Sequence, residues 1–331
     1  MTSPRASERI LTVSGLKTHF RTPEGIVRAV DDISFHLDRG EVLALVGESG
    51  CGKSVTAHSI LGLVKAPPAK VEGSILFEGR ELVGLSQAEY RRIRGMRISM
   101  IFQEPMSSFD PLYTVGQQLT EVARAHMPWS DAETKERIIA TLKLVHIPDP
   151  EKRYNEYPHE MSGGMLQRIM IAMALITSPE IIIADEPTTA LDVTIQAQVL
   201  NLMQSLQDEY EGSIIFITHD LGTVAEIADR VHVMYAGKIV EKASVVELFD
   251  SPLHPYTAGL LASRVKREHK GKQLPYIEGY VPRADQFPEG CRFNPRCPRA
   301  MAKCKRLQPP DFEPVSGHTV ACWLYEGSGL G

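Results

Sequence analysis

The sequence lacks long hydrophobic runs, is poor in cysteine and carries little net charge, and each of these absences excludes a class of protein. No apolar stretch reaches the roughly 18 residues of a membrane-spanning helix, because polar residues interrupt the richest one, residues 169–184. Five cysteines in 331 residues are too few for a secreted, disulfide-built scaffold. The first ten residues contain no apolar segment of a secretory signal. We therefore expect a soluble cytosolic protein that only other chains can hold at a membrane.

The charge and composition exclude further classes of protein and partner. There are 36 basic and 41 acidic residues, and the resulting formal charge of −5 gives no reason to expect nucleic acid as a partner. Hydrophobic residues make up 43% and charged residues 23%, which is globular composition and excludes wholesale disorder, collagen and coiled coils. The length suggests about two domains.

Short apolar strands alternate with helical patterns along the first 250 residues. Residues 32–38 alternate polar and apolar side chains, as in a half-buried strand, and residues 231–242 indicate a hairpin around Gly237. The region from about 106 to 177 is predicted to be helical. This alternation favours an α/β fold with a mainly parallel sheet. The buried strands are expected at residues 42–46, 98–102, 181–184 and 214–217.

A phosphate-binding loop follows the first buried strand. Gly47, Gly52, Lys53 and Ser54 match the pattern G-x-x-x-x-G-K-[ST], with a helix expected next. Glycines let backbone N–H groups turn toward a polyphosphate, and the helix directs the positive end of its dipole at the same anion. Lys53 is expected to reach the β- and γ-phosphates, and the Ser54 hydroxyl to ligate Mg²⁺. Cys51 is expected to be only a small filler of the loop.

Polar residues follow three more of the predicted strands. Asp185 and Glu186 end the strand at 181–184, where P-loop enzymes hold Mg²⁺ and activate the attacking water. Gln103 and His219 follow two other strands, and strand C-termini share one edge of a parallel sheet. We therefore expect these side chains to face the γ-phosphate.

A second anion-binding feature lies at the start of another helix. Ser162, Gly163 and Gly164 precede an apolar helical segment. One nucleotide hardly needs two such loops from one chain, so this pattern predicts a dimer in which each chain caps the nucleotide on its partner's P-loop. The plain alternative is an ordinary helix N-cap at Ser162.

Together these motifs resemble the nucleotide-binding subunit of an ABC transporter over residues 8–250, with Ala190-Leu191-Asp192 completing the ordered set. Residues 252–257 (PLHPYT) and 290–298 (GCRFNPRCP) resemble the C-terminal extension of oligopeptide/dipeptide importer ATPases of the D type. The resemblance implies a P-loop NTPase with a RecA-like parallel core, an N-terminal antiparallel β subdomain, a helical subdomain at about 106–177 and a small cysteine-containing extension, 251–331. The usual signature LSGGQ is here MSGGM, which leaves the finer role of its last position open.

The resemblance also implies roles for individual residues. Glu186 would be the catalytic base and His219 would contact the γ-phosphate. The Mg²⁺ ion would be bound by Ser54, Gln103 and Asp185. Asp192 would lie at the dimer interface. The trans signature would consist of Ser162, Gly163 and Gly164, with Arg153 also reaching the partner's nucleotide. ATP would be bound by Ser49, Gly50, Cys51, Gly52, Lys53, Ser54 and Val55, with Phe20 on an early strand stacking on adenine.

Four of the five cysteines, Cys291, Cys297, Cys304 and Cys322, lie in the extension. Four soft thiolates suggest Zn²⁺ or an iron–sulfur cluster, and the spacing leaves the choice open because no tight C-x2–4-C knuckle is present. The resemblance favours [4Fe-4S] over zinc. Six basic residues between 292 and 306 would offset the charge of an anionic cluster, or simply be solvated.

The sequence thus predicts an ATPase that closes as a dimer and powers solute import. The resemblance implies a homologous F-type ATPase partner, two membrane permeases, an extracytoplasmic binding protein, and a peripheral location on the cytoplasmic face of the cell membrane. Peptides are the first expectation for the cargo, with nickel, glutathione or sugars as alternatives. The competing interpretations are a soluble, non-transport ABC ATPase and an iron–sulfur sensor with vestigial hydrolysis.

Overall fold

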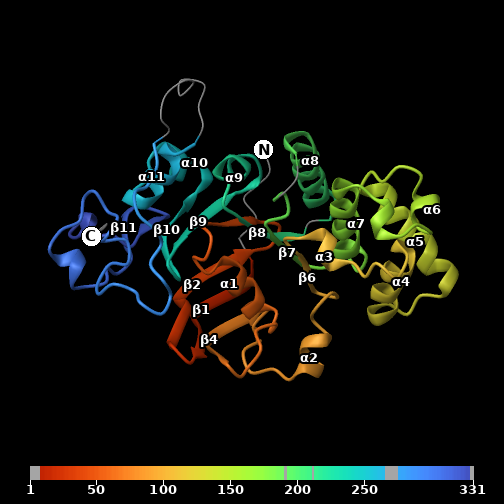
Figure 1. Cartoon of the computed structure of the whole chain (residues 1–331), viewed down its shortest axis with the longest axis horizontal. Coiled ribbons are helices and arrows are strands. Elements are labelled where there is room, and N and C mark those ends of the chain that lie inside the picture. The colour runs from red at the N-terminus through yellow and green to blue at the C-terminus, as the bar shows by residue number, and fades with distance from the viewer. Residues whose placement is uncertain (1–7, 190–191, 211, 265–274, 329–331) are drawn as a thin grey trace. The chain divides into compact units, whose positions relative to one another are not determined.

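The computed structural model describes residues 8–189, 192–210, 212–264 and 275–328, and the chain forms two compact units (Figure 1). Unit 1 combines Met1–Gly84 with Ile217–Gly331, and unit 2 is Leu85–Phe216. The N-terminal and C-terminal parts of the sequence therefore share one unit.

Unit 1 contains an antiparallel sheet, as the resemblance implies. Its strand order is β2 (Gly25–Asp38), β1 (Arg9–Thr22), β4 (Ala69–Phe77), β5 (Arg80–Glu81). Ile33, Phe35 and Leu37 of β2 are all buried, which confirms the alternation read from the sequence.

The other strands of unit 1 follow the order β11 (Phe312–Val315), β12 (His318–Val320), β10 (Lys238–Ser244), β9 (Arg230–Tyr235), β3 (Val42–Val46). β3 pairs in parallel with β9. β9 and β10 form the predicted hairpin, whose turn residues Ala236 and Gly237 both have positive φ, 48° and 79°, as a two-residue turn between twisted strands requires. The helices of unit 1 are α1 (Lys53–Ile60), α9 (Leu221–Ile227), α10 (Val245–Asp250) and α11 (Pro255–Ala262), with 3-10 turns at Lys303–Lys305 and Trp323–Tyr325.

β11 and β12 lie beyond the first 250 residues, where the sequence pattern predicted no strands, and are therefore a correction. Both are short, and Pro314 interrupts the pattern of β11. They form because β12 pairs with β10, through Glu241 opposite Val320 and Lys242 opposite Thr319. In Figure 1 the C-terminal segment accordingly lies beside β10. The domain boundary near residue 250 stays a prediction.

Unit 2 is mainly helical, as predicted for residues 106–177. Its strands are β6 (Ile98–Ile101), β7 (Ile181–Asp185) and the start of β8 (Ser213–Thr218), with β7 parallel to β6. Its helices are α2 (Gln87–Arg91), α3 (Pro105–Ser108), α4 (Val115–His126), α5 (Asp131–Leu144), α6 (Pro150–Arg153), α7 (Gly163–Leu175) and α8 (Val193–Tyr210), with a 3-10 turn at Pro158–Glu160.

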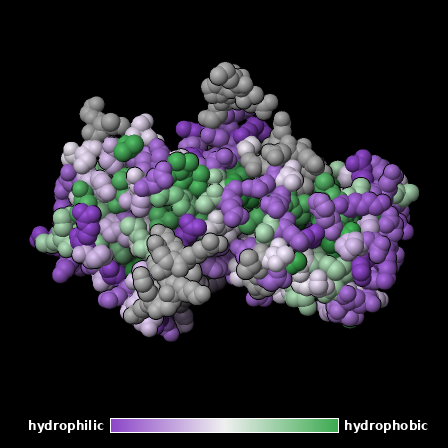
Figure 2. All heavy atoms as spheres, turned by 90° about the horizontal axis from the view of Figure 1, so that it is seen from above, coloured by the Kyte–Doolittle hydropathy of each residue, from purple (hydrophilic) through white to green (hydrophobic). Residues whose placement is uncertain are grey.

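The part of unit 2 formed by α4, α5 and α6, on the right in Figure 2, carries mainly hydrophilic residues on the face shown. Among the described residues of the whole chain, no helix combines the length and apolar character needed to cross a bilayer.

Glu241 of β10 anchors the extension in unit 1. Its side chain is fully buried, and its carboxylate accepts hydrogen bonds from the backbone N–H groups of Leu253 (2.7 Å) and His254 (3.0 Å). Nε2 of His318 in β12 lies 2.8 Å from the same carboxylate. One buried acid therefore joins β10 to the segment before α11 and to β12.

We expect Glu241→Ala to lower the free energy of unfolding by about 3–5 kcal/mol, because removing one partner of a buried pair leaves the other polar groups without compensation. Denaturant unfolding of the purified chain measures this. Lys242→Ala is the matched control: the neighbouring Lys242 pairs with Asp311 of the same extension at 2.8 Å, but at the exposed surface, and its loss should cost less than about 1 kcal/mol. Equal costs for the two variants would contradict the anchoring role.

Candidate active site

The P-loop connects β3 to α1 in unit 1. All five residues of β3 are buried, as expected for a central strand. A Cβ on Gly47 would lie 2.2 Å from the carbonyl oxygen of Met234, and a Cβ on Gly52 would lie 2.4 Å from that of Ala29. Both glycines also have positive φ, 157° and 109°. The loop is therefore packed so closely against the backbone of neighbouring strands that only glycine fits at these two positions.

The side chain of Lys53 is held in place by hydrogen bonds to the backbone of the P-loop. The side chain is buried, and Nζ donates to the carbonyl oxygens of Gly47 (2.8 Å) and Glu48 (3.3 Å). Ser49 and Gly50 at the tip are exposed, whereas Cys51 and Gly52 are buried, and Ser54 and Val55 are half-buried at the start of α1. The ammonium thus lies inside a loop whose tip is open to solvent.

Cys51 fills space under the loop, as the sequence analysis expected. Burial raises the pKa of its thiol, so the group stays protonated and unreactive at neutral pH. Its backbone carbonyl accepts a hydrogen bond from the N–H of Gly237, at 2.9 Å. The hairpin turn between β9 and β10 therefore supports the loop.

Gln103 and Glu186 meet in unit 2. β6 and β7 are parallel neighbours, so the residues that follow them lie at the same edge, and Gln103 Nε2 donates to Glu186 Oε2 at 3.1 Å. Thr189 Oγ1 donates to the same oxygen at 2.9 Å. Glu186 has a φ of +47°, unusual for a residue with a side chain. Asp185, directly before it, is buried at the end of β7.

His219 follows β8 in unit 1 and is exposed. The next residue, Asp220, caps α9 by accepting from Gly222 N at 2.7 Å, which fixes the backbone just after His219. His219 therefore belongs to the same compact unit as the P-loop, whereas Gln103, Asp185 and Glu186 belong to unit 2.

The serine–glycine–glycine motif forms the exposed N-terminus of α7 in unit 2. Ser162 is the N-cap, and its Oγ accepts from Met165 N at 3.3 Å. A Cβ on Gly163 would meet nothing within 4 Å, whereas a Cβ on Gly164 would lie 2.8 Å from Cγ2 of Ile195. The packing of this chain therefore explains a glycine at position 164 but not at position 163.

Three further predicted residues have local partners. Arg153 bonds Glu156 at 2.6 Å, and this bond lowers the pKa of the Glu156 carboxyl. Asp192 accepts from Ile195 N at 3.0 Å at the start of α8. Phe20 lies half-buried on β1, opposite Val27 and Ala69. Their roles at a nucleotide or an interface stay predictions, and Ala190 and Leu191 lie outside the described residues.

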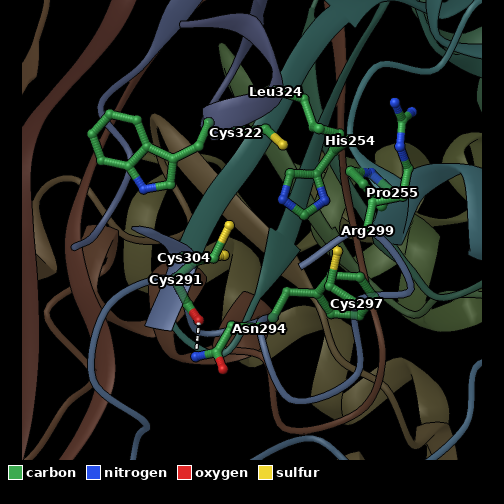
Figure 3. A pocket seen from close by; sticks show the side chains of 11 residues that line it. His254, Pro255, Cys291, Asn294, Cys297, Arg299, Cys304, Cys322 and Leu324 are labelled. Atoms are coloured by element: carbon green, nitrogen blue, oxygen red, sulfur yellow. Dashed lines mark hydrogen bonds between the residues drawn. The ribbon is translucent and has the colours of Figure 1, made fainter. Parts of the chain in front are cut away.

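The four late cysteines line one cavity in unit 1. Cys291, Cys297, Cys304 and Cys322 share it with His254 and Arg299. Figure 3 shows the sulfur atoms of Cys297, Cys304 and Cys322 beside the ring of His254. All four are free thiols. In the part of the chain that the structure describes, no group of three or more His, Cys, Asp or Glu side chains already has the arrangement of a metal site.

Burial favours the protonated form of Cys291, Cys297 and Cys322. It raises the pKa of Cys291 to about 11 and also raises the pKa values of Cys297 and Cys322, which Arg299 partly counteracts for the latter two. Metal binding needs thiolates, so a bound cation would have to supply the charge that offsets their burial. The donor set of four clustered thiols is nevertheless one that iron–sulfur clusters and zinc prefer.

Two of the basic residues near the cysteines form ion pairs with acidic residues outside the cysteine cavity. Arg296 binds Glu48 of the P-loop, at 2.7 and 3.1 Å, and Arg292 binds Asp31 of β2. Only Arg299 of this group lines the cysteine cavity. The contact between Arg296 and Glu48 could not be predicted from the sequence, because no local pattern links residues 248 positions apart.

Residues 30–189 match the family model described as ABC transporter, and residues 240–304 match the model described as oligopeptide/dipeptide transporter, C-terminal region. The chain is 50% identical to the Bacillus subtilis oligopeptide transport ATP-binding protein AppD, covering 97% of this chain and 98% of that protein. It is 50% identical to the dipeptide transport ATP-binding protein DppD of the same organism, covering 96% of each. It is 46% identical to the oligopeptide transport ATP-binding protein OppD of Salmonella typhimurium, covering 97% and 95%.

Solved structures agree with the fold. The ATP-binding cassette MJ0796, described as a dimer in a post-hydrolysis state bound to ADP and Pi, is 25% identical with a TM-score of 0.65, covering 71% of this chain and 98% of that one. The cbiO1 protein of Clostridium perfringens, part of the ABC transporter complex cbiONQ, is 28% identical with a TM-score of 0.63, covering 74% and 92%.

Proposed function

Because this chain belongs to the family of ATP-binding subunits of oligopeptide and dipeptide ABC transporters, we propose that its ATP hydrolysis powers the uptake of peptides. The observation that carries this assignment is that the likeness to peptide-transport proteins continues through the C-terminal extension, beyond the part shared by ABC ATPases in general. The chain is an ABC transporter ATPase.

Lys53 and the amides of residues 49–55 would bind the phosphates of ATP. The Lys53 ammonium now bonds the carbonyl oxygens of Gly47 and Glu48, and phosphate oxygens would replace these weaker acceptors, because hydrogen bonds between charged groups are roughly twice as strong. The open tip of the loop, Ser49 and Gly50, gives the phosphates access to the backbone N–H groups. Phe20 would stack on adenine.

Ser54, Asp185 and Gln103 would hold Mg²⁺. A hydroxyl, a carboxylate and an amide oxygen are the hard ligands that this ion prefers. The amide nitrogen of Gln103 is engaged by Glu186, so its oxygen is the atom that can face a cation. When bound, the ion would neutralise charge on the β- and γ-phosphates.

Glu186 would act as the general base, and His219 would contact the γ-phosphate. The hydrogen bonds from Gln103 and Thr189 hold one carboxylate oxygen of Glu186 in place, and the carboxylate would receive the proton of the attacking water. Because Gln103 bonds this carboxylate directly, a displacement of Gln103 would move the base. This contact gives the membrane subunits a route to control hydrolysis.

The signature helix would complete the site of a second ATPase subunit. Ser162 and Gly163 are exposed at the N-terminus of α7, where unpaired backbone N–H groups and the helix dipole attract a phosphate. Gly164 and Arg153 would assist, and Asp192 would lie at the interface. We propose a heterodimer with a homologous F-type subunit, held by two permeases at the cytoplasmic face of the membrane and served by an extracytoplasmic binding protein.

Reconstitution tests the assigned cargo. ATP turnover of the complex in vesicles, with the binding protein inside the lumen, should rise when dipeptides or oligopeptides are added with it. Nickel, glutathione and sugars are the comparison ligands, and stimulation by one of these in place of peptides would overturn the peptide assignment while leaving the ATPase in place.

Cys291, Cys297, Cys304 and Cys322 would hold a [4Fe-4S] cluster. The support is that these four thiols, which are far apart in sequence, line one cavity with one cationic side chain, Arg299. The cluster would act as a structural staple, because the segment around it contains little regular secondary structure. Zinc is the alternative occupant of the same four thiols.

We expect Cys297→Ser to remove the iron and the visible absorption of the protein purified without oxygen. Metal analysis and absorption spectra measure the effect, and Cys51→Ser is the matched control, because Cys51 lies in the P-loop and not in the cavity lining. Zinc in the wild-type protein, or iron unaffected by Cys297→Ser, would contradict the cluster.

A further inference from the structure

Glu48, the second residue of the P-loop, is bonded through every polar group it has. Its carbonyl oxygen accepts from Lys53 Nζ at 3.3 Å, and its N–H donates to the hydroxyl oxygen of Tyr256 at 2.9 Å. Its carboxylate accepts from both terminal nitrogens of Arg296, at 2.7 and 3.1 Å. Tyr256 and Arg296 both belong to the C-terminal extension and lie in the same compact unit as Glu48.

Arg296 is built into its position. Its side chain is only 4% exposed. Nε donates to the carbonyl oxygen of Glu278 at 2.9 Å, and Nη2 donates to that of Ile277 at 3.2 Å. A bidentate guanidinium–carboxylate contact with these further anchors is a directional connection, which a flexible lysine could not reproduce.

Tyr256 forms the second connection. Burial raises the pKa of its hydroxyl, so the group stays neutral and accepts the Glu48 N–H with an oxygen lone pair. Its ring packs 4.6 Å from that of Tyr235 and 5.4 Å from that of Phe293, measured between centroids. Phe293 and His254 also line the cysteine cavity, so the same aromatic cluster supports both the P-loop and that cavity.

A carboxylate in a phosphate-binding loop weakens the binding of a polyphosphate unless its negative charge is neutralised. An unpaired Glu48 would repel the phosphates, and it would also be free to compete for Lys53, the ammonium that the phosphates need. The Arg296 fork offsets this charge and holds the carboxylate in place.

We infer that Arg296 and Tyr256 are positioning residues for ATP binding, which act through Glu48 to neutralise and orient the P-loop from the C-terminal extension. This inference rests on the proposed role of the loop in binding ATP. It gives the extension a task in the reaction of the ATPase core, separate from any metal that the cysteines hold. A residue that acts through the loop should change the affinity for ATP more than the rate of the chemical step.

The test compares the KM for ATP with kcat in the assembled transporter. Arg296→Met should raise KM about tenfold, as expected when one charge-assisted contact is lost, with kcat within about twofold of wild type. Arg296→Lys keeps the charge without the fork and should fall between the two. Arg283→Met is the matched control, because Arg283 is a largely exposed arginine of the same extension that pairs with Asp285.

A double variant separates positioning from a merely structural effect. Glu48→Gln combined with Arg296→Met removes the unpaired carboxylate, so KM should return most of the way toward wild type. Tyr256→Phe, which removes only the hydroxyl, should also raise KM and provides a second variant if Arg296→Met fails to fold. Equal KM values for Arg296→Met, Tyr256→Phe and Arg283→Met, or no rescue in the double variant, would overturn the inference.

Failure of the proposed function can be distinguished from failure of the positioning role. If the wild-type complex hydrolyses ATP without a response to peptide, the cargo assignment fails and the positioning role is still measured. If the wild-type P-loop does not bind ATP, the proposed function fails before the variants are compared.

Discussion

Glu186→Gln is expected to lower ATP turnover of the assembled transporter at least a hundredfold, the low end of what a general base contributes. Glutamine has the shape of glutamate but cannot accept a proton from the attacking water. Its amide oxygen can still accept the hydrogen bonds that Gln103 and Thr189 now donate to Glu186. The fold and ATP binding should therefore survive, and the complex should accumulate in its closed, ATP-bound form.

Phosphate release measures the loss of turnover, and binding of labelled ATP measures whether ATP binding survives. Glu326→Gln is the control, because Glu326 is an exposed acid that pairs with Lys303 in the extension. If Glu186→Gln keeps turnover within tenfold of wild type, another group removes the proton and the assignment of the base is wrong.

Gly163→Asp should abolish hydrolysis in the complex without weakening the folded subunit. An added Cβ at this position meets nothing within 4 Å in its own chain. An aspartate in the first turn of α7 should even be favourable, because it faces the positive end of the helix dipole. The same carboxylate would repel the phosphates of a nucleotide bound by a partner subunit. We expect a loss in turnover of at least a hundredfold, about 2.7 kcal/mol of lost stabilisation.

The isolated subunit supplies the control for this experiment. Its unfolding midpoint and its affinity for ATP should equal those of wild type, because the P-loop that binds the nucleotide is untouched. Gly164→Ala provides a contrast, since its methyl group would lie 2.8 Å from Cγ2 of Ile195 and should destabilise the chain itself. Full turnover by Gly163→Asp would refute the shared site, and so would loss of ATP binding by the isolated subunit.

The sequence predicted the elements that carry strong local signals. Residues 42–46 were expected as a strand buried on both faces, and β3 has these bounds. The strands before Gln103 and Asp185 are also present, so the parallel pairing of β6 and β7 brings Gln103 to Glu186 as expected from the shared edge. These predictions succeeded because continuous apolar runs and loop glycines act over a few residues.

The contacts of the extension could not be predicted in this way. β12 pairs with β10 and β11, and the carboxylate of Glu241 is accommodated in the core because His318 and two backbone N–H groups lie beside it. Arg296 was read as one of several cations near the cysteines, whereas its partner is Glu48. Each of these contacts forms because the tertiary fold brings together residues that are distant in sequence. Composition and local spacing therefore could not predict them.

The pairing of β12 along β10 also has a consequence for how the protein behaves in concentrated solution. Without residues beyond 251, β10 would end the sheet as a bare strand with a row of unused N–H and C=O groups, a template for joining sheets from separate molecules. The extension pairs with this edge at Glu241 and Lys242. We therefore expect a chain trimmed to the ATPase core to precipitate at concentrations where the full chain stays in solution.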